Sequence, residues 1–96
     1  MLIYHFNINI TRMQQQDIEN LHKLGKKIKE LRLEKSKSLN EFVLNKGYLT
    51  TATWSRIENG LFDIKFSTLL RIARMLDIRA DELLKSINLD YNFTDD

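Results

Sequence analysis

The chain of 96 residues contains no cysteine and no proline, and only three glycines. Without cysteine it can form neither a disulfide framework nor a thiolate metal site, and it has no cysteine nucleophile. No apolar run approaches the ~20 residues that span a membrane, and the N-terminus lacks the basic leader of a signal peptide. The length predicts one domain, and the absences predict a cytoplasmic protein.

Patterns that indicate an enzyme are also missing. The two histidines, His5 and His22, have no metal-ligand or catalytic-triad spacing around them, so both are interpreted as surface or packing residues. The chain has no glycine-rich phosphate loop, no nucleophile elbow and no His-Glu-x-x-His helix. We therefore expect no enzymatic activity, no metal and no cofactor.

The charge of the chain is unevenly distributed, although its net value is only +2. Residues 12–37 contain eight basic and four acidic side chains, whereas residues 61–96 contain five basic and seven acidic ones. A basic segment is compatible with a surface that faces phosphates, but a solvated helix face accounts for the same pattern.

The first helix is predicted over residues 13–35, because apolar residues recur there at helical spacing. These are Ile18, Leu21, Leu24, Ile28 and Leu31. Gly25 lies inside this pattern and costs about 1 kcal/mol relative to alanine. Either the helix breaks at Gly25, or a neighbouring backbone needs the space that a side chain would fill.

Two short helices with a tight turn between them are predicted next. Ser38 offers an N-cap, and Glu41 completes a capping box for a helix that ends near Gly47. Thr50 is the N-cap of a third helix, which runs to Glu58. The predicted buried residues are Leu39, Phe42, Val43, Trp54 and Ile57. This order is the helix-turn-helix arrangement, whose second helix fits the major groove of DNA, although a small helical bundle without a DNA role has the same periodicity.

A fourth helix is predicted over residues 66–77 and a fifth over residues 80–86. Their predicted buried residues are Phe66, Leu69, Leu70, Ala73, Leu76, Leu83 and Leu84.

Residues 24–84 resemble the lambda-repressor/Cro-like (XRE) helix-turn-helix family. The resemblance rests on four segments: LGKKIKELRLEK, Ser38-x-x-Glu41-Phe42-Val43, TTATWSRIENG and TLLRIARMLDIRADELL. It implies a mainly α, five-helix lambda-repressor-like DNA-binding domain at residues 13–86, with the helix-turn-helix at about 38–58. It also implies a double-stranded DNA partner.

The resemblance further assigns roles to individual residues. The base-reading positions are Thr51, Ala52, Ser55 and Arg56, and the phosphate-contacting positions are Lys37, Ser38, Lys46, Thr50 and Asn59. Arg56 is the best candidate for direct readout, because a guanidinium can bridge O6 and N7 of guanine. A phosphate contact or a surface salt bridge is its alternative role. Glu58 is expected to pair with Arg32 as a structural salt bridge, and Trp54, where the family usually has leucine or isoleucine, is expected to be a core anchor.

Some positions depart from the family pattern. The segment NKGYLT makes the turn between the second and third helices one residue longer than usual, which leaves the angle of the recognition helix open. Ile64 stands where the family has proline, with Lys65 as the only nearby cation. Leu61 and Phe62 are apolar for a loop, so the N-terminal segment or a second subunit is expected to cover them.

The ends of the chain alternate between apolar and polar residues, which predicts short β-strands at residues 4–10 and 87–93. The first strand belongs to an N-terminal arm at residues 1–12, and the second belongs to a C-terminal strand and tail at residues 87–96. We expect the two strands to form part of a homodimer interface. Pairing within one chain and a disordered N-terminus are the alternatives. The packing residues would be Tyr4, Phe6, Ile8, Ile10, Ile87, Leu89, Tyr91 and Phe93.

The sequence therefore predicts a cytoplasmic, DNA-binding transcriptional regulator that acts as a dimeric repressor on a palindromic operator. Two alternatives remain open. The chain could be the antitoxin of a toxin–antitoxin operon, with a toxin as protein partner, or a protein–protein adaptor that uses the same fold.

Overall fold

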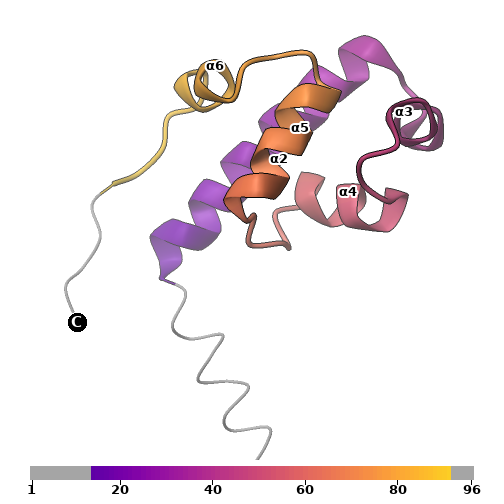
Figure 1. The fold of residues 1–96 in the computed structure, drawn as a ribbon. Helices are drawn as coiled ribbons and strands as arrows, with labels where there is room; N and C mark the ends of the chain where they lie inside the picture. Colours follow the sequence, from indigo (N-terminus) through magenta and orange to yellow (C-terminus); the bar gives the residue numbers. More distant parts are fainter. Residues whose placement is uncertain (1–13, 92–96) are drawn as a thin grey trace, which may run out of the picture.

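The computed structural model describes residues 14–91 and shows a mainly helical domain (Figure 1). Its elements are α2 (Gln15–Lys35), α3 (Leu39–Lys46), α4 (Thr51–Glu58), α5 (Phe66–Met75) and α6 (Ala80–Lys85). In the view of Figure 1, α3 and α4 lie on one side of α2, and α6 lies on the other. The predicted set of five helices is confirmed within the described residues.

Local hydrogen bonds account for the boundaries of α3 and α4. The Ser38 hydroxyl accepts a hydrogen bond from the Glu41 N–H at 3.3 Å, and the Thr50 hydroxyl accepts one from the Thr53 N–H at 3.1 Å. Gly47 closes α3 with a φ of 73°, a left-handed conformation that glycine adopts without a steric penalty. Both predicted N-caps are therefore confirmed, but the predicted capping box at Ser38 is not complete, because no hydrogen bond from the Ser38 N–H to the Glu41 side chain is found within the described residues.

The core lies where all five helices meet. It is built around the Trp54 side chain, which is fully buried and packs against Phe42 with 4.9 Å between the ring centroids. The other buried members of the cluster are Leu24, Ile28, Val43, Ile57, Ile72, Met75, Leu76 and Leu83. Phe62, Ile64 and Ile87 pack against its edge.

The predicted buried face of α5 is wrong in part. Phe66 and Leu70 are 73% and 45% exposed, whereas Ile72 and Met75 are buried. The face of α5 that meets the core therefore includes Ile72 and Met75 in place of Phe66 and Leu70. The helix also ends at Met75 rather than at residue 77.

The predicted C-terminal strand is wrong for its described part, residues 87–91, which contain no strand. The Asp90 N–H donates to Asn20 Oδ1 and the Asp90 carbonyl accepts from Asn20 Nδ2, both at 2.8 Å. Lys23 Nζ donates to the Asn88 carbonyl at 2.8 Å. Side chains of α2 thus form hydrogen bonds with the backbone groups that a neighbouring strand would otherwise bind, and the segment lies alongside α2 (Figure 1).

The proposed packing residues of the two strands therefore have different outcomes. Ile87 and Leu89 are half-buried, while Tyr91 is 74% exposed. Tyr4, Phe6, Ile8, Ile10 and Phe93 lie outside the described residues.

Gly25 lies in an unbroken helix, at the place where α2 contacts α4. A Cβ built on Gly25 would clash with the carbonyl oxygen of Ile57 and would lie 2.7 Å from that of Glu58. The second explanation for this glycine is therefore correct: the neighbouring backbone needs the space.

We expect Gly25→Ala to lower the free energy of unfolding by about 1–3 kcal/mol, because backbone atoms cannot move aside for the new methyl group. Urea denaturation followed by circular dichroism measures the change. Lys29→Ala, an exposed substitution on the same helix, is the matched control and should change stability little. A gain of about 1 kcal/mol for Gly25→Ala, the value for a helix glycine without close neighbours, would contradict the explanation.

Candidate nucleic-acid interface

α4 presents a polar face to solvent. Ala52, Arg56 and Asn59 are exposed, and Thr51 and Ser55 are half-buried beside them. Residues 52, 56 and 59 follow i, i+4, i+7 spacing, so their side chains lie along one side of the helix. The opposite side carries Trp54 and Ile57, which are buried. The structure thus brings the four predicted base-reading residues together on the outer part of one short helix.

The Arg56 side chain has no competing partner among residues 14–91. It forms no hydrogen bond or ion pair with any other residue of the described range 14–91, and it is exposed. A surface salt bridge, one of the two alternatives to base readout, is therefore disfavoured.

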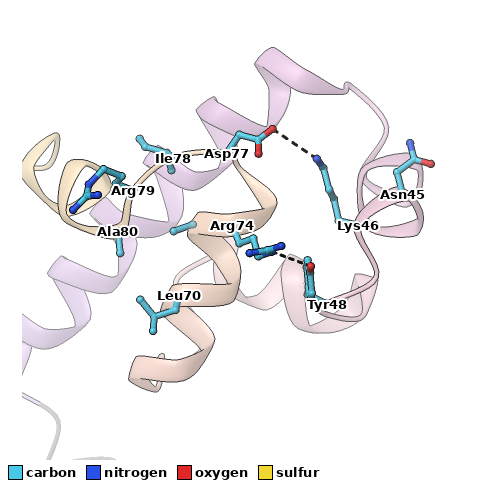
Figure 2. Close-up of a pocket in the computed structure, with 10 residues that line it drawn as sticks. Asn45, Lys46, Tyr48, Leu70, Arg74, Asp77, Ile78, Arg79 and Ala80 are labelled. Atoms are coloured by element: carbon cyan, nitrogen blue, oxygen red, sulfur yellow. Dashed lines mark hydrogen bonds and ion pairs between the residues drawn. The ribbon is translucent and has the colours of Figure 1, made fainter.

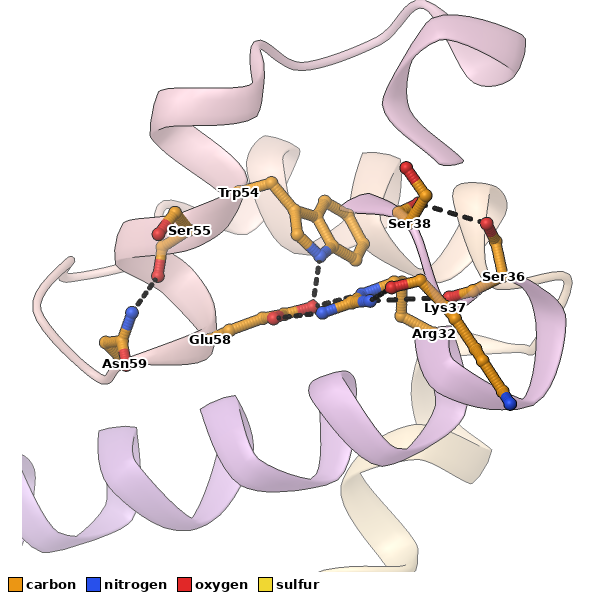
Figure 3. A network of polar contacts seen from close by, with 8 residues as sticks. All are labelled: Arg32, Ser36, Lys37, Ser38, Trp54, Ser55, Glu58 and Asn59. Carbon is orange, nitrogen blue, oxygen red and sulfur yellow. Dashed lines mark hydrogen bonds and ion pairs between the residues drawn. The ribbon is translucent and has the colours of Figure 1, made fainter. Parts of the chain in front are cut away.

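The two predicted phosphate contacts at the ends of α4 already have hydrogen-bond partners. The Thr50 hydroxyl donates to Thr53 Oγ1 at 3.0 Å, in addition to accepting from the Thr53 N–H. Asn59 Nδ2 donates to the Ser55 carbonyl at 2.8 Å (Figure 3). Both side chains therefore stabilise the helix termini. The Asn59 amide uses only one of its donors in this contact, so it keeps further hydrogen-bonding capacity.

Lys37 and Ser38 lie at the corner between α2 and α3, and both are exposed. The Ser36 hydroxyl donates to the Ser38 carbonyl at 3.0 Å, and Arg32 Nη1 donates to the Lys37 carbonyl at 3.0 Å. These contacts hold the backbone of the corner, while the Lys37 amine extends away from the network (Figure 3).

Lys46, another predicted phosphate contact, already has an ion-pair partner. Its amine is 3.8 Å from Asp77 Oδ2, at the turn between α5 and α6 (Figure 2). This surface ion pair is of the weak, exchangeable kind.

A buried ion pair holds α4 to α2, as predicted. Arg32 Nε donates to Glu58 Oε2 at 2.9 Å and Arg32 Nη2 donates to Glu58 Oε1 at 2.8 Å, and each side chain is only 6% exposed. This bidentate geometry is the strongest arrangement of the two groups. The hydrogen bonds to Glu58 raise the pKa of the Arg32 guanidinium above its ordinary value, so both the geometry and the charge favour the paired state.

Trp54 completes this pair, a role that the sequence analysis missed. Its indole Nε1 donates to Glu58 Oε2 at 2.6 Å, so the carboxylate accepts three hydrogen bonds (Figure 3). The i, i+4 spacing of Trp54 and Glu58 on one helix was the available sequence signal. Arg32 also donates to the Ser36 carbonyl at 3.3 Å. We call Arg32, Glu58 and Trp54 the clamp.

Residues 14–91 contain neither a metal site nor a membrane-spanning helix. No cluster of histidine, aspartate or glutamate there could hold a metal ion. None of the described helices is long and apolar enough to cross a membrane.

We expect Glu58→Gln to destabilise the protein by about 3–5 kcal/mol, because the glutamine leaves the Arg32 charge buried without a counter-ion. The urea concentration at half-unfolding measures the effect. Glu34→Gln makes the same chemical change at an exposed position of α2 and is the matched control. Equal midpoints for the two variants would show that the clamp contributes nothing specific.

Comparisons with known proteins agree with this geometry. Residues 23–88 match the sequence profile of the Cro/C1-type HTH DNA-binding domain. The chain is also similar to the restriction-modification controller protein C.AhdI from Aeromonas hydrophila, known from a high-resolution crystal structure. The identity is 29% and the TM-score 0.60, and the match covers 68% of this chain and 97% of that chain. A comparison with curated proteins gave no match. Because the profile match extends over more than half of the sequence, the chain belongs to the family of Cro/C1-type helix-turn-helix DNA-binding domains.

Proposed function

We propose that the chain is a transcriptional repressor that binds a palindromic operator in the cytoplasm as a dimer, with α4 in the major groove. The observation that carries this proposal is the pairing of an exposed polar face on α4 with a buried clamp behind it. Base readout requires side chains held in a defined orientation. The similarity to a protein described as a restriction-modification controller supports a role in gene regulation.

Arg56 is the proposed principal base reader. Its side chain is exposed and is unpaired within residues 14–91, so it reaches DNA without first breaking a protein contact. A guanidinium can donate to both acceptors on the major-groove edge of guanine. Thr51 and Ser55 can form single hydrogen bonds beside it, and the methyl group of Ala52 can contact a thymine methyl group.

Lys37 is the proposed principal phosphate contact. It is exposed and projects from a corner whose backbone is held by Arg32. Lysine contacts to phosphate contribute affinity without regard to base sequence. Ser38, Thr50 and Asn59 are proposed to assist through groups not used in capping, and Lys46 would have to leave Asp77 to take part.

Arg56→Ala is expected to relax the sequence preference of the protein at one position of each half-site. The loss of a bidentate contact costs about 1–3 kcal/mol of discrimination between bases. Selection of bound sequences from random DNA at physiological salt, followed by affinity measurements on operator variants, would reveal the change.

Lys37→Ala is the matched control for this experiment, because it also removes one cation but from a proposed phosphate contact. It should weaken binding to all sequences similarly and reduce the slope of log affinity against log salt by about one unit. An operator preference that is unchanged by Arg56→Ala would contradict the assignment of Arg56. The absence of any selected sequence for the unmodified protein would contradict the proposed function itself.

A dimer is proposed because palindromic half-sites lie about 34 Å apart and require two linked recognition helices. Since residues 87–91 pack on their own chain, we propose the loop after α4 as the subunit contact. There Leu61 is 73% exposed, whereas its neighbour Phe62 packs against the core. A large exposed apolar side chain at this place is consistent with a subunit contact.

Leu61→Asp is therefore expected to convert the dimer to a monomer, because it places a charge in an apolar contact. Sedimentation velocity over a range of protein concentrations measures the effect. Leu44→Asp, at an apolar position on α3 that is 83% exposed, is the control and should leave the dimer intact. If Leu61→Asp dimerises as strongly as the unmodified chain, the interface lies elsewhere.

A further inference from the structure

A cleft of about 770 Å³ opens between the C-terminal end of α3, the turn that follows it, α5 and the start of α6 (Figure 2). Its lining combines apolar groups with cations: Leu70, Ala73, Ile78, Lys46, Arg74 and Arg79. None of these residues except Lys46 has a part in the proposed DNA contacts. The proposed DNA contacts therefore do not account for the cleft.

Arg74 is held in a fixed orientation within this cleft. Its Nε donates to the Tyr48 hydroxyl at 2.9 Å, and its guanidinium carbon lies 5.7 Å from the centroid of the Tyr48 ring. Figure 2 shows the side chain reaching from α5 toward the turn that carries Tyr48. Among the described residues, Nη1 and Nη2 of Arg74 have no hydrogen-bond partner. Two parallel N–H groups held in this way match the two oxygens of a carboxylate.

The charge around the cleft also favours an anion. Lys46, Arg74 and Arg79 line it together with a single carboxylate, Asp77. Asp77 lies 3.6 Å from the amine of Lys35 and 3.8 Å from that of Lys46, and Arg79 pairs with Asp81 at 3.0 Å. With Lys35 and Asp81 counted as well, there are four cations and two carboxylates. A net positive charge attracts acidic partners and rejects basic ones.

The exposed rim of the cleft favours a protein segment over a small molecule as its ligand. Tyr48 and Leu70 are 44% and 45% exposed, and the side chains of Asp77 and Arg79 are 69% and 75% exposed. Sites for small molecules bury most of the ligand surface, which this open cleft cannot do. A segment of a protein can place one apolar side chain in the cleft while the rest of that protein covers the surrounding surface.

We propose that this cleft docks an acidic segment of a partner protein. An aspartate or glutamate of the partner accepts the two N–H groups at the end of Arg74, and an adjacent leucine-sized side chain packs on Leu70 and Ile78. The docking surface shares only Lys46 with the proposed DNA contacts and does not include the exposed face of α4, so this inference does not depend on the proposed function.

The test uses the full chain labelled with ¹⁵N and a short peptide that carries one leucine flanked by glutamates. The peptide should shift the amide signals of Tyr48, Leu70 and Arg74 and leave those of Ala52 and Arg56 in place. A peptide in which glutamine replaces every glutamate should produce no shift.

Arg74→Gln should weaken the peptide affinity by about tenfold, which corresponds to the loss of charge-assisted hydrogen bonds. Arg71→Gln is the matched control, because Arg71 is an exposed arginine of the same helix that does not line the cleft. It should keep the affinity of the unmodified chain. Tyr48→Phe retains the ring but frees Arg74, so it should also weaken binding, which provides a second variant if Arg74→Gln folds poorly.

Several results would overturn the proposal. Equal weakening by Arg74→Gln and Arg71→Gln would indicate general electrostatic attraction rather than docking. Shifts at the cleft that depend on protein concentration alone would identify a second copy of the chain as the occupant. Shifts of the Leu70 and Arg74 signals caused by a DNA duplex would identify the cleft as a nucleic-acid surface, and the absence of any peptide shift would show that it is not a docking site.

Discussion

The burial of the Glu58 carboxylate is the constraint on which the rest of this structure depends. A charge with so little exposure is tolerated only when its oxygens are satisfied by strong donors. Arg32 and Trp54 supply three hydrogen bonds to it. Because Arg32 belongs to α2 and also binds the carbonyls of Ser36 and Lys37, one carboxylate connects α2, the corner after it and α4.

The clamp explains several other features of the helical packing. It can form only if α4 lies close against α2, and Gly25 provides that closeness by leaving room for the carbonyls of Ile57 and Glu58. With one side of α4 committed to Trp54 and Ile57, the residues at 52, 56 and 59 must face outward. The exposed face of α4, which is the proposed DNA-binding surface, is thus a consequence of how the opposite side is held.

The domain has a second organised surface at the cleft beside α5. There Tyr48 and Arg74 join the turn of the helix-turn-helix to α5. A hydrogen bond and a cation–π contact hold the middle of this turn against α5. The proposed DNA-binding face and the proposed docking cleft thus belong to one small domain.

The sequence by itself determined the helices, their caps and the Arg32–Glu58 pair. Periodicity and capping depend on residues a few positions apart, and the ion pair follows from the family pattern. Only the tertiary structure decided the reason for Gly25, the exposure of Phe66, the pairing of Lys46 with Asp77 and the packing of residues 87–91 on α2. Each depends on which distant groups meet. The alternating pattern at 87–91 is also compatible with a strand. In the folded chain, however, the side chains of Asn20 and Lys23, far away in sequence, form hydrogen bonds with the backbone of this segment.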